Sequence, residues 1–190
     1  MAGNISFKSR IRPILGNEFA KISSTIAETN FVNSPWTIKE SVKATRAVTT
    51  GVFDCSVLGI TDGLKVFLLH LCPTNPENEK FDEIKNFIVN NLDTKTSNLK
   101  AALFGSQYYG RRSTKLFDNL KNLMTELKIP CSTFRQCWEY FNVLYDSNKD
   151  EWCVSSLPIE CSLTSGKTDS EEILKKAFYK IELSPFDEFA

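Results

Sequence analysis

Residues 49–70 read TTGVFDCSVLGITDGLKVFLLH, and this stretch decides the fold. It holds two apolar runs rich in residues that favour strands, with an Asp-Gly pair between them. Asp-Gly in this position is a strong signal for a β-hairpin, because a type I′ turn needs positive φ at both central residues. The sequence therefore predicts two neighbouring antiparallel strands that are joined at Asp62 and Gly63.

This turn fixes which side chains face one another. If Thr61 lies opposite Leu64, counting six residues away from the turn along each strand places Cys55 directly opposite His70. Directly opposed residues have Cβ atoms about 4.5–5.5 Å apart, so the thiol and the imidazole can share a proton, as an activated cysteine nucleophile requires. A three-residue turn would instead shift the register by one and leave the two side chains diagonal or on opposite faces.

Thr49 lies six residues before Cys55 and is the third candidate. Its hydroxyl can orient the imidazole or bind substrate, although threonine is also favoured in strands for its shape alone. A cysteine in an apolar strand is more often packing, and a strand histidine is more often structural. The predicted pairing of Cys55 with His70 is what favours a catalytic interpretation.

Length and charge narrow the class of protein. The 190 residues predict one domain, 1–190, because a chain of this length buries a sizeable core. Lys plus Arg and Asp plus Glu each number 23, so no net charge favours nucleic acid, an acidic lipid surface or an acidic substrate. The first 20 residues lack the apolar segment of a signal peptide, and no apolar run is long enough to span a membrane.

The six cysteines are expected to be thiols, since the chain shows no secretory signal and its compartment is then reducing. No C-x-x-C motif occurs and His70 is the only histidine, so the usual zinc spacings are missing. We therefore expect no zinc site of the usual kind. Apart from Cys55, the cysteines are interpreted as buried apolar residues, namely Cys72, Cys131, Cys137, Cys153 and Cys161. The alternative is that Cys131, Cys137, Cys153 and Cys161 converge into a metal site.

Hydrophobic periodicity divides the chain into three parts. Residues 1–42 show no sustained period and predict an extension packed on the core, with at most a short helix where Phe19 and Ile22 recur. Residues 43–158 form the predicted core. Residues 159–190 predict a C-terminal turn and helix.

Within the core, the pattern alternates between strands and helices. One helix is expected to begin at Asn75 and Pro76, and a second carries apolar residues at helical spacing from Leu116 to Leu127. This order predicts the α+β class, with a β-sandwich or mixed-sheet core flanked by helices. The expected strands are Ala44–Thr50, Val52–Ile60, Leu64–Leu71, Leu99–Phe104, Cys131–Gln136, Tyr140–Tyr145 and Glu151–Leu157.

Thr49, Cys55 and His70 come before a helix, the turn Leu103-Phe104-Gly105-Ser106, a second helix that ends in Ile129-Pro130-Cys131, and two further strands. Over roughly residues 48–157, this order resembles the chemoreceptor glutamine deamidase (CheD) family. The Thr-x5-Cys spacing is similar to that family. The fifteen residues from Cys55 to His70 are similar to the spacing in the catalytic domains of the cytotoxic necrotizing factors.

The resemblance implies a Cys-His hydrolase fold with a β-sandwich core, and a protein-glutamine deamidase that needs no cofactor. Cys55 would attack the carboxamide carbon, and His70 would move the protons. Thr49 would orient His70 or bind substrate, while backbone amides near Cys55 would hold the oxyanion. The partner would be a protein that presents a glutamine side chain.

Three settings remain open for this chemistry. The preferred one is a bacterial effector or toxin that reaches host cytosol without a signal peptide, and the segment 185–190 is either its secretion signal or a disordered end. The second is a chemoreceptor-type deamidase in bacterial cytoplasm. The third is a catalytically inactive binding module of the same fold, with Tyr108, Tyr109, Arg111 and Arg112 as a partner surface or, alternatively, a solvated loop.

Overall fold

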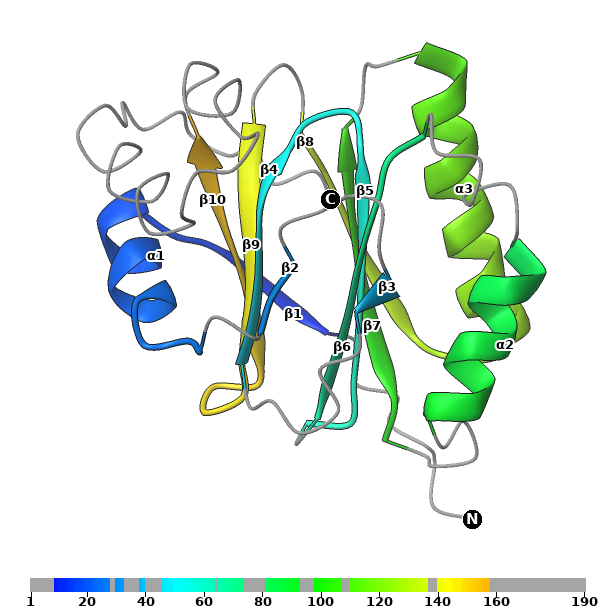
Figure 1. The fold of residues 1–190 in the computed structure, drawn as a ribbon, viewed down its shortest axis with the longest axis horizontal. Coiled ribbons are helices and arrows are strands. Elements are labelled where there is room, and N and C mark those ends of the chain that lie inside the picture. The colour runs from blue at the N-terminus through cyan, green and yellow to red at the C-terminus, as the bar shows by residue number, and fades with distance from the viewer. Residues whose placement is uncertain are drawn as a thin grey trace.

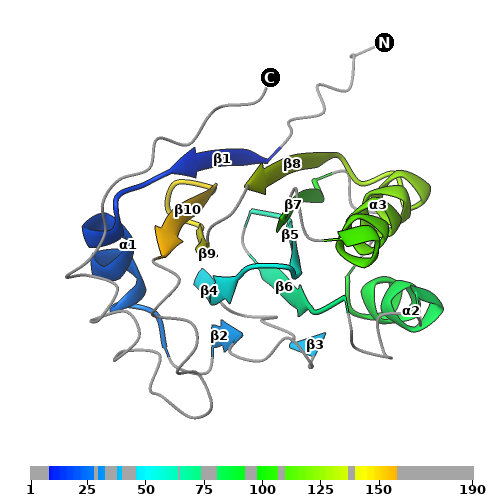
Figure 2. The same cartoon turned by 90° about the horizontal axis from the view of Figure 1, so that it is seen from above.

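The computed structural model describes residues 9–27, 30–32, 38–39, 46–63, 65–73, 81–92, 98–106, 110–136 and 140–157. Two five-stranded sheets pack face to face, and helices cover both outer faces, so the described chain has four layers (Figures 1 and 2). Helix α1 (Gly16–Ser23) covers the first sheet, and α2 (Phe81–Asn91) and α3 (Gly110–Glu126) cover the second. The predicted α+β class with mixed sheets flanked by helices is confirmed.

The first sheet has the strand order β1-β10-β9-β4-β2. Its three central strands are antiparallel, whereas both edge strands pair in parallel with their neighbours. Both edge strands come from the N-terminal part of the chain. The strands are β1 (Arg10–Pro13), β2 (Phe31–Val32), β4 (Arg46–Val52), β9 (Tyr140–Asp146) and β10 (Glu151–Leu157).

The second sheet has the order β3-β6-β5-β7-β8 and is antiparallel except for the β7–β8 pair. That parallel pair is connected by α3, which packs back onto the sheet, as a crossover between parallel strands requires. The strands are β3 (Ile38–Lys39), β5 (Ser56–Thr61), β6 (Val66–Leu71), β7 (Lys100–Ser106) and β8 (Cys131–Gln136).

Every residue of β5 and β6 is buried, because the second sheet is covered on both faces. Alternate side chains therefore pack into different layers. Val57 and Leu68 lie between the two sheets, whereas Leu58 and Leu69 pack against α2 and α3. This explains why the hairpin sequence is apolar on both faces and carries few polar positions.

The space between the sheets is tightly filled around Trp152. The indole is fully buried and lies over Gly59 of β5, where an added Cβ would come within 2.0 Å of the ring. Real Cβ atoms do not approach a ring this closely, so only glycine fits at this position. Tyr145 and Phe104 flank the indole with ring centroids 4.8 and 5.7 Å away, which makes these aromatic rings the centre of the inter-sheet core.

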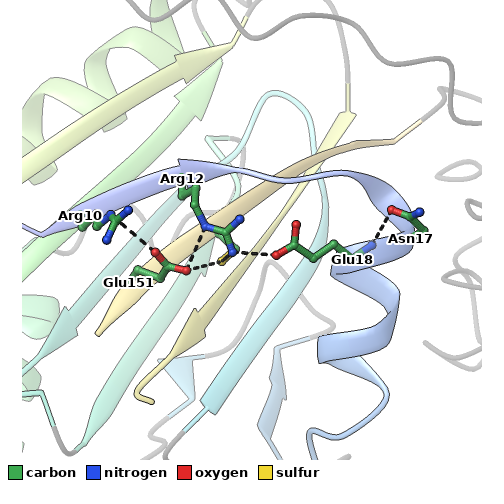
Figure 3. Close-up of polar contacts among 6 residues, drawn as sticks. Arg10, Arg12, Asn17, Glu18 and Glu151 are labelled. Atoms are coloured by element: carbon green, nitrogen blue, oxygen red, sulfur yellow. Dashed lines mark hydrogen bonds and ion pairs between the residues drawn. The ribbon is translucent and has the colours of Figure 1, made fainter. Parts of the chain in front are cut away.

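A charged cluster fastens β1 to the first sheet (Figure 3). Arg12 donates one hydrogen bond of 2.9 Å to Glu151 and another of 2.8 Å to Glu18 of α1. Arg10 also pairs with Glu151, at 3.6 Å, and the Cys153 thiol lies beside both groups. The side chain of Glu151 is only 2% exposed. The carboxylate is therefore stable in the interior because two guanidinium groups offset its charge.

Two strand predictions match the structure at both ends, namely Cys131–Gln136 and Glu151–Leu157. The single strand predicted for Val52–Ile60 is wrong, because the chain bends at Phe53 and Asp54 before β5 begins. A β-bulge comes just before this bend: the register between β4 and β9 shifts between Thr49 and Val52.

Gly51 makes the bulge possible. Its φ is +67°, and its amide donates to Asn142 Oδ1 at 3.2 Å.

Residues 1–42 were expected to pack on the core, and their described part also supplies β1, β2 and β3 as edge strands. The predicted C-terminal turn and helix, 159–190, and the helix start at Asn75 and Pro76 lie outside the described residues.

Candidate active site

The predicted hairpin between Val52 and Leu71 exists, but its register is different. Thr61 faces Val66 and Val57 faces His70, so four residues, 62–65, connect β5 to β6. The predicted type I′ turn is therefore wrong, although Gly63 does have a positive φ of 94°. The physical reason lies in two side chains that stabilise the longer loop. Thr61 Oγ1 accepts from the Gly63 amide at 2.9 Å, and Asp62 Oδ1 accepts from the Lys65 amide at 2.7 Å.

The shift has a direct consequence for the candidate pair. Cys55 does not lie opposite His70, because the observed register, continued by one residue beyond β5, places Cys55 opposite Cys72. A shift of two residues keeps each side chain on its original face. Cys55 and His70 thus share the inter-sheet face of the hairpin as diagonal neighbours, with Cα atoms typically about 7–8 Å apart.

His70 and Thr49 meet across the sandwich. His70 lies on β6 of the second sheet and Thr49 on β4 of the first, and these strands face each other (Figure 2). Both side chains are buried, and Thr49 Oγ1 lies 2.7 Å from Nδ1 of His70. The structure therefore joins two of the three residues that the sequence singled out, and it does so between sheets.

The hydrogen bonds around Thr49 determine the tautomer of His70. The Thr49 hydroxyl donates its single proton to the backbone carbonyl of Val32 at 2.7 Å, and that oxygen can only accept. Thr49 Oγ1 must therefore accept from His70, which makes Nδ1 the protonated nitrogen of the neutral ring. Nε2 then carries the lone pair, and it has no hydrogen-bond partner among the described residues.

Burial also sets the charge of the imidazole. Removal from water disfavours the cationic form and lowers the pKa of His70 to about 4. At neutral pH the ring is therefore uncharged, with Nε2 available as a base. A fixed tautomer and an unpartnered lone pair together give the ring a single basic nitrogen.

Cys55 lies in a different environment from the one predicted. Its thiol is buried, donates to Asp54 Oδ1 at 3.5 Å and lies near Cys72. Desolvation raises the pKa of Cys55 well above its usual range, and the neighbouring Asp54 and Cys72 raise it further. Cys55 is therefore a neutral thiol at pH 7, and its attack on a carbonyl would need a base to remove the proton as the bond forms.

The chain matches no protein-family model, and no curated protein matches it.

Sequence reasoning missed three participants of the site. These are Val32, whose carbonyl fixes the Thr49 hydroxyl, and the two neighbours of Cys55, namely Asp54 and Cys72. A four-residue loop at Asp62 brings Cys55 opposite Cys72, whereas the turns considered from the sequence had two or three residues. No sequence pattern identifies the backbone carbonyl of Val32 as part of the site, because every residue carries a backbone carbonyl.

The proposed partner surface is only partly within the described chain. Tyr108 and Tyr109 lie outside it, whereas Arg111 and Arg112 belong to the first turn of α3 and not to a loop. Among the described residues, no helix is long and apolar enough to cross a membrane, which agrees with the sequence.

Proposed function

We propose that the chain is a cysteine-dependent protein-glutamine amidohydrolase, which converts a glutamine side chain of a substrate protein to glutamate and releases ammonia. One observation carries the proposal. The hydrogen bond from His70 Nδ1 to Thr49 leaves Nε2 of a neutral imidazole as an unoccupied base, on the same sheet face as the Cys55 thiol. The order and spacing of Thr49, Cys55 and His70 support the same reading.

The reaction follows from these roles. Nε2 of His70 removes the thiol proton as Cys55 Sγ attacks the carboxamide carbon, and backbone amides near Cys55 hold the oxyanion. The protonated imidazole then donates to the leaving nitrogen, so ammonia departs and a thioester remains. His70 next removes a proton from water, which attacks the thioester and releases glutamate and the free thiol. Water is the only co-reactant.

Thr49 acts as a positioning residue in this scheme. Its oxygen accepts the hydrogen bond from Nδ1–H, which keeps the ring in the one tautomer whose basic nitrogen is Nε2. A positive charge that develops on the imidazole also strengthens the Nδ1–H···Oγ1 hydrogen bond. Thr49 therefore favours the protonated ring that forms after Cys55 loses its proton.

The setting that we propose is a bacterial effector or toxin acting on a protein in host cytosol. A chemoreceptor-type deamidase in bacterial cytoplasm uses the same chemistry on a different substrate. The two settings differ in the compartment and in the protein that presents the glutamine.

A second candidate is a catalytically inactive binding module. One observation favours it: burial and the neighbouring Asp54 raise the pKa of Cys55, which is opposite to the direction expected for an activated nucleophile. In such a module the His70–Thr49 hydrogen bond would only join the two sheets.

The deciding experiment is proteomic. Host lysate and bacterial membranes that contain chemoreceptors are each incubated with wild-type protein, with Cys55→Ala or with His70→Ala, and peptides are searched for Gln-to-Glu conversion. We expect conversion with wild type only, in host lysate for an effector and in bacterial membranes for a chemoreceptor enzyme. Cys131→Ala is the matched control, because this cysteine begins β8 on the far edge strand and should leave the activity unchanged.

Two results would overturn the proposal. The first is that wild-type protein converts no more glutamine than His70→Ala does, both in host lysate and in bacterial membranes. The second is Cys55→Ala that retains the conversion. The first result would favour the binding module, and the second would place the nucleophile elsewhere.

A further inference from the structure

Three potential metal ligands lie close together where the β5–β6 hairpin opens. Asp54 and Cys55 come directly before β5, and Cys72 directly follows β6. One carboxylate oxygen and the two sulfur atoms all lie within 4.8 Å of one another. This proximity results from the observed register, which pairs Ser56 with Leu71 and so brings the adjoining Cys55 and Cys72 together.

We propose that Asp54, Cys55 and Cys72 form a binding site for a thiophilic divalent cation of the zinc type, held by two thiolates and one carboxylate. The fourth tetrahedral position would remain open to water. Two sulfurs and one oxygen suit Zn²⁺ or Co²⁺, whereas Mg²⁺ and Ca²⁺ prefer all-oxygen sites.

The separation of the ligand atoms fits this coordination. Zn–S and Zn–O distances are about 2.3 and 2.0–2.2 Å, so two sulfurs and one oxygen around one zinc ion lie roughly 3.5–3.8 Å apart at tetrahedral angles. The observed limit of 4.8 Å is about one ångström wider. Side-chain rotation can close this difference, since Cys55 already turns its thiol toward Asp54 Oδ1 at 3.5 Å.

A divalent cation lets a coordinating thiol ionise outright. Binding would accordingly release the thiol protons.

The exposure of the three side chains would let a cation enter the site from solvent. Cys55 is only 7% exposed and would be the innermost ligand, whereas Asp54 and Cys72 are partly exposed and would receive the ion from solvent. Strands β5 and β6 are paired over six residues, and this backbone ladder ends at Ser56 and Leu71, which directly adjoin the two cysteines. A site on such a scaffold needs little reorganisation.

The site shares Cys55 with the proposed reaction but does not depend on it. A bound cation would hold the sulfur as a ligand and keep it from attacking a carboxamide. If the chain is a deamidase, zinc inhibits it and a chelator restores it. If the chain is an inactive module, the cation still binds, and so the two proposals can fail separately.

The test is a titration of the reduced full chain with Co²⁺, kept reduced by a phosphine. We expect one equivalent to bind and to produce the near-ultraviolet absorption of thiolate-to-cobalt charge transfer. Cys55→Ser and Cys72→Ser should weaken binding by more than the roughly 10–100-fold loss that second-shell changes cause. Asp54→Asn should weaken it less, and Cys131→Ser should leave it unchanged.

A second measurement needs no variant. Zn²⁺ should protect Cys55 and Cys72 of the wild-type chain from alkylation, as mapped by peptide mass spectrometry, while Cys131 is labelled at the same rate with and without zinc. The proposal is wrong if the cobalt band does not appear, if the band survives in a folded Cys55→Ser/Cys72→Ser double variant, or if zinc leaves the labelling of Cys55 and Cys72 unchanged.

Discussion

Two buried polar side chains of this sandwich are accommodated in opposite ways. Glu151 of β10 is charged and is held by Arg12 and Arg10, which offset its charge. His70 of β6 is uncharged, and one of its two nitrogens has no partner among the described residues. The carboxylate cluster ties β1 to β10 and α1, whereas the imidazole is supported on one side only, by Thr49.

The difference separates a structural role from a chemical one. A buried charge depends on its partners, because removing one of them exposes the full cost of desolvation. A buried base with a free lone pair also costs free energy, but it retains a reactive atom. The comparison therefore predicts large losses of stability at the Glu151 cluster and smaller ones toward Cys55.

The largest effect is expected for Arg12→Met. Methionine keeps an unbranched apolar stem but leaves Glu151 with Arg10 alone, so we expect a loss of about 3 kcal/mol in the free energy of unfolding, measured by urea denaturation. Arg10→Met is the matched control. The Arg10 side chain is 70% exposed and lies 3.6 Å from the carboxylate, so it should cost less than about 1 kcal/mol. Equal losses in the two variants would contradict the role given to Arg12.

The second effect is a dependence of stability on pH, measured with a chelator present. The folded pKa of His70 is lowered to about 4 from an unfolded value near 6.5, so the unfolded chain binds more protons between these values. Stability is complete above pH 6.5 and falls as the pH drops toward 4, by about 3 kcal/mol in all.

The chain simplifies this measurement, because His70 is its only histidine. His70→Gln should abolish the slope between pH 6.5 and 5. Glu18 contributes at lower pH: its hydrogen bond with Arg12 lowers its carboxyl pKa, so that stabilisation is lost only as the pH falls below the usual range of a glutamate. A wild-type slope that persists in His70→Gln would show that another group titrates.

A smaller loss is expected for Thr49→Val, which keeps the side-chain shape and removes the hydroxyl. Nδ1–H of His70 and the carbonyl of Val32 both lose their partner, at a cost of about 2 kcal/mol. Thr49→Ser retains the hydroxyl and should cost less than about 1 kcal/mol. The decisive readout is the imidazole nitrogen spectrum by NMR, in which wild type and Thr49→Ser should show protonated Nδ1. The same tautomer in Thr49→Val would mean that Thr49 does not determine it.

The smallest loss is expected for Cys55→Ser. The substitution exchanges one atom and keeps the hydrogen bond to Asp54, so the free energy of unfolding should change by about 1 kcal/mol. Thermal melting of this variant beside Arg12→Met measures the contrast directly. A loss as large as that of Arg12→Met would assign Cys55 to the structural group and remove it from the proposed reaction.

Local patterns predicted the elements better than their connections. The helical period from Leu116 to Leu127 lies within α3 and its end, and the strands at Cys131–Gln136 and Glu151–Leu157 were predicted to the residue. These elements follow from apolar spacing, which is a property of a short stretch of sequence. The position of Asp-Gly between β5 and β6 was equally clear.

The register was not predictable, because it depends on which side-chain hydrogen bonds the loop prefers. Thr61 and Asp62 each satisfy a loop amide, and the sequence does not rank this four-residue loop against the tighter turn. The contact between Thr49 and His70 depends on how two sheets stack. The Arg12–Glu151 pair joins residues 139 positions apart and has no local signal.

The pairing of β1 with β10 also affects folding during translation. The partner position of Arg10, at Glu151, is synthesised about 140 residues after Arg10 itself. At the usual rates of about 5–20 residues per second, β1 waits several seconds or longer for its partner. During translation the first sheet is therefore incomplete at this edge, and a chaperone that binds unpaired strands has its opportunity in that interval.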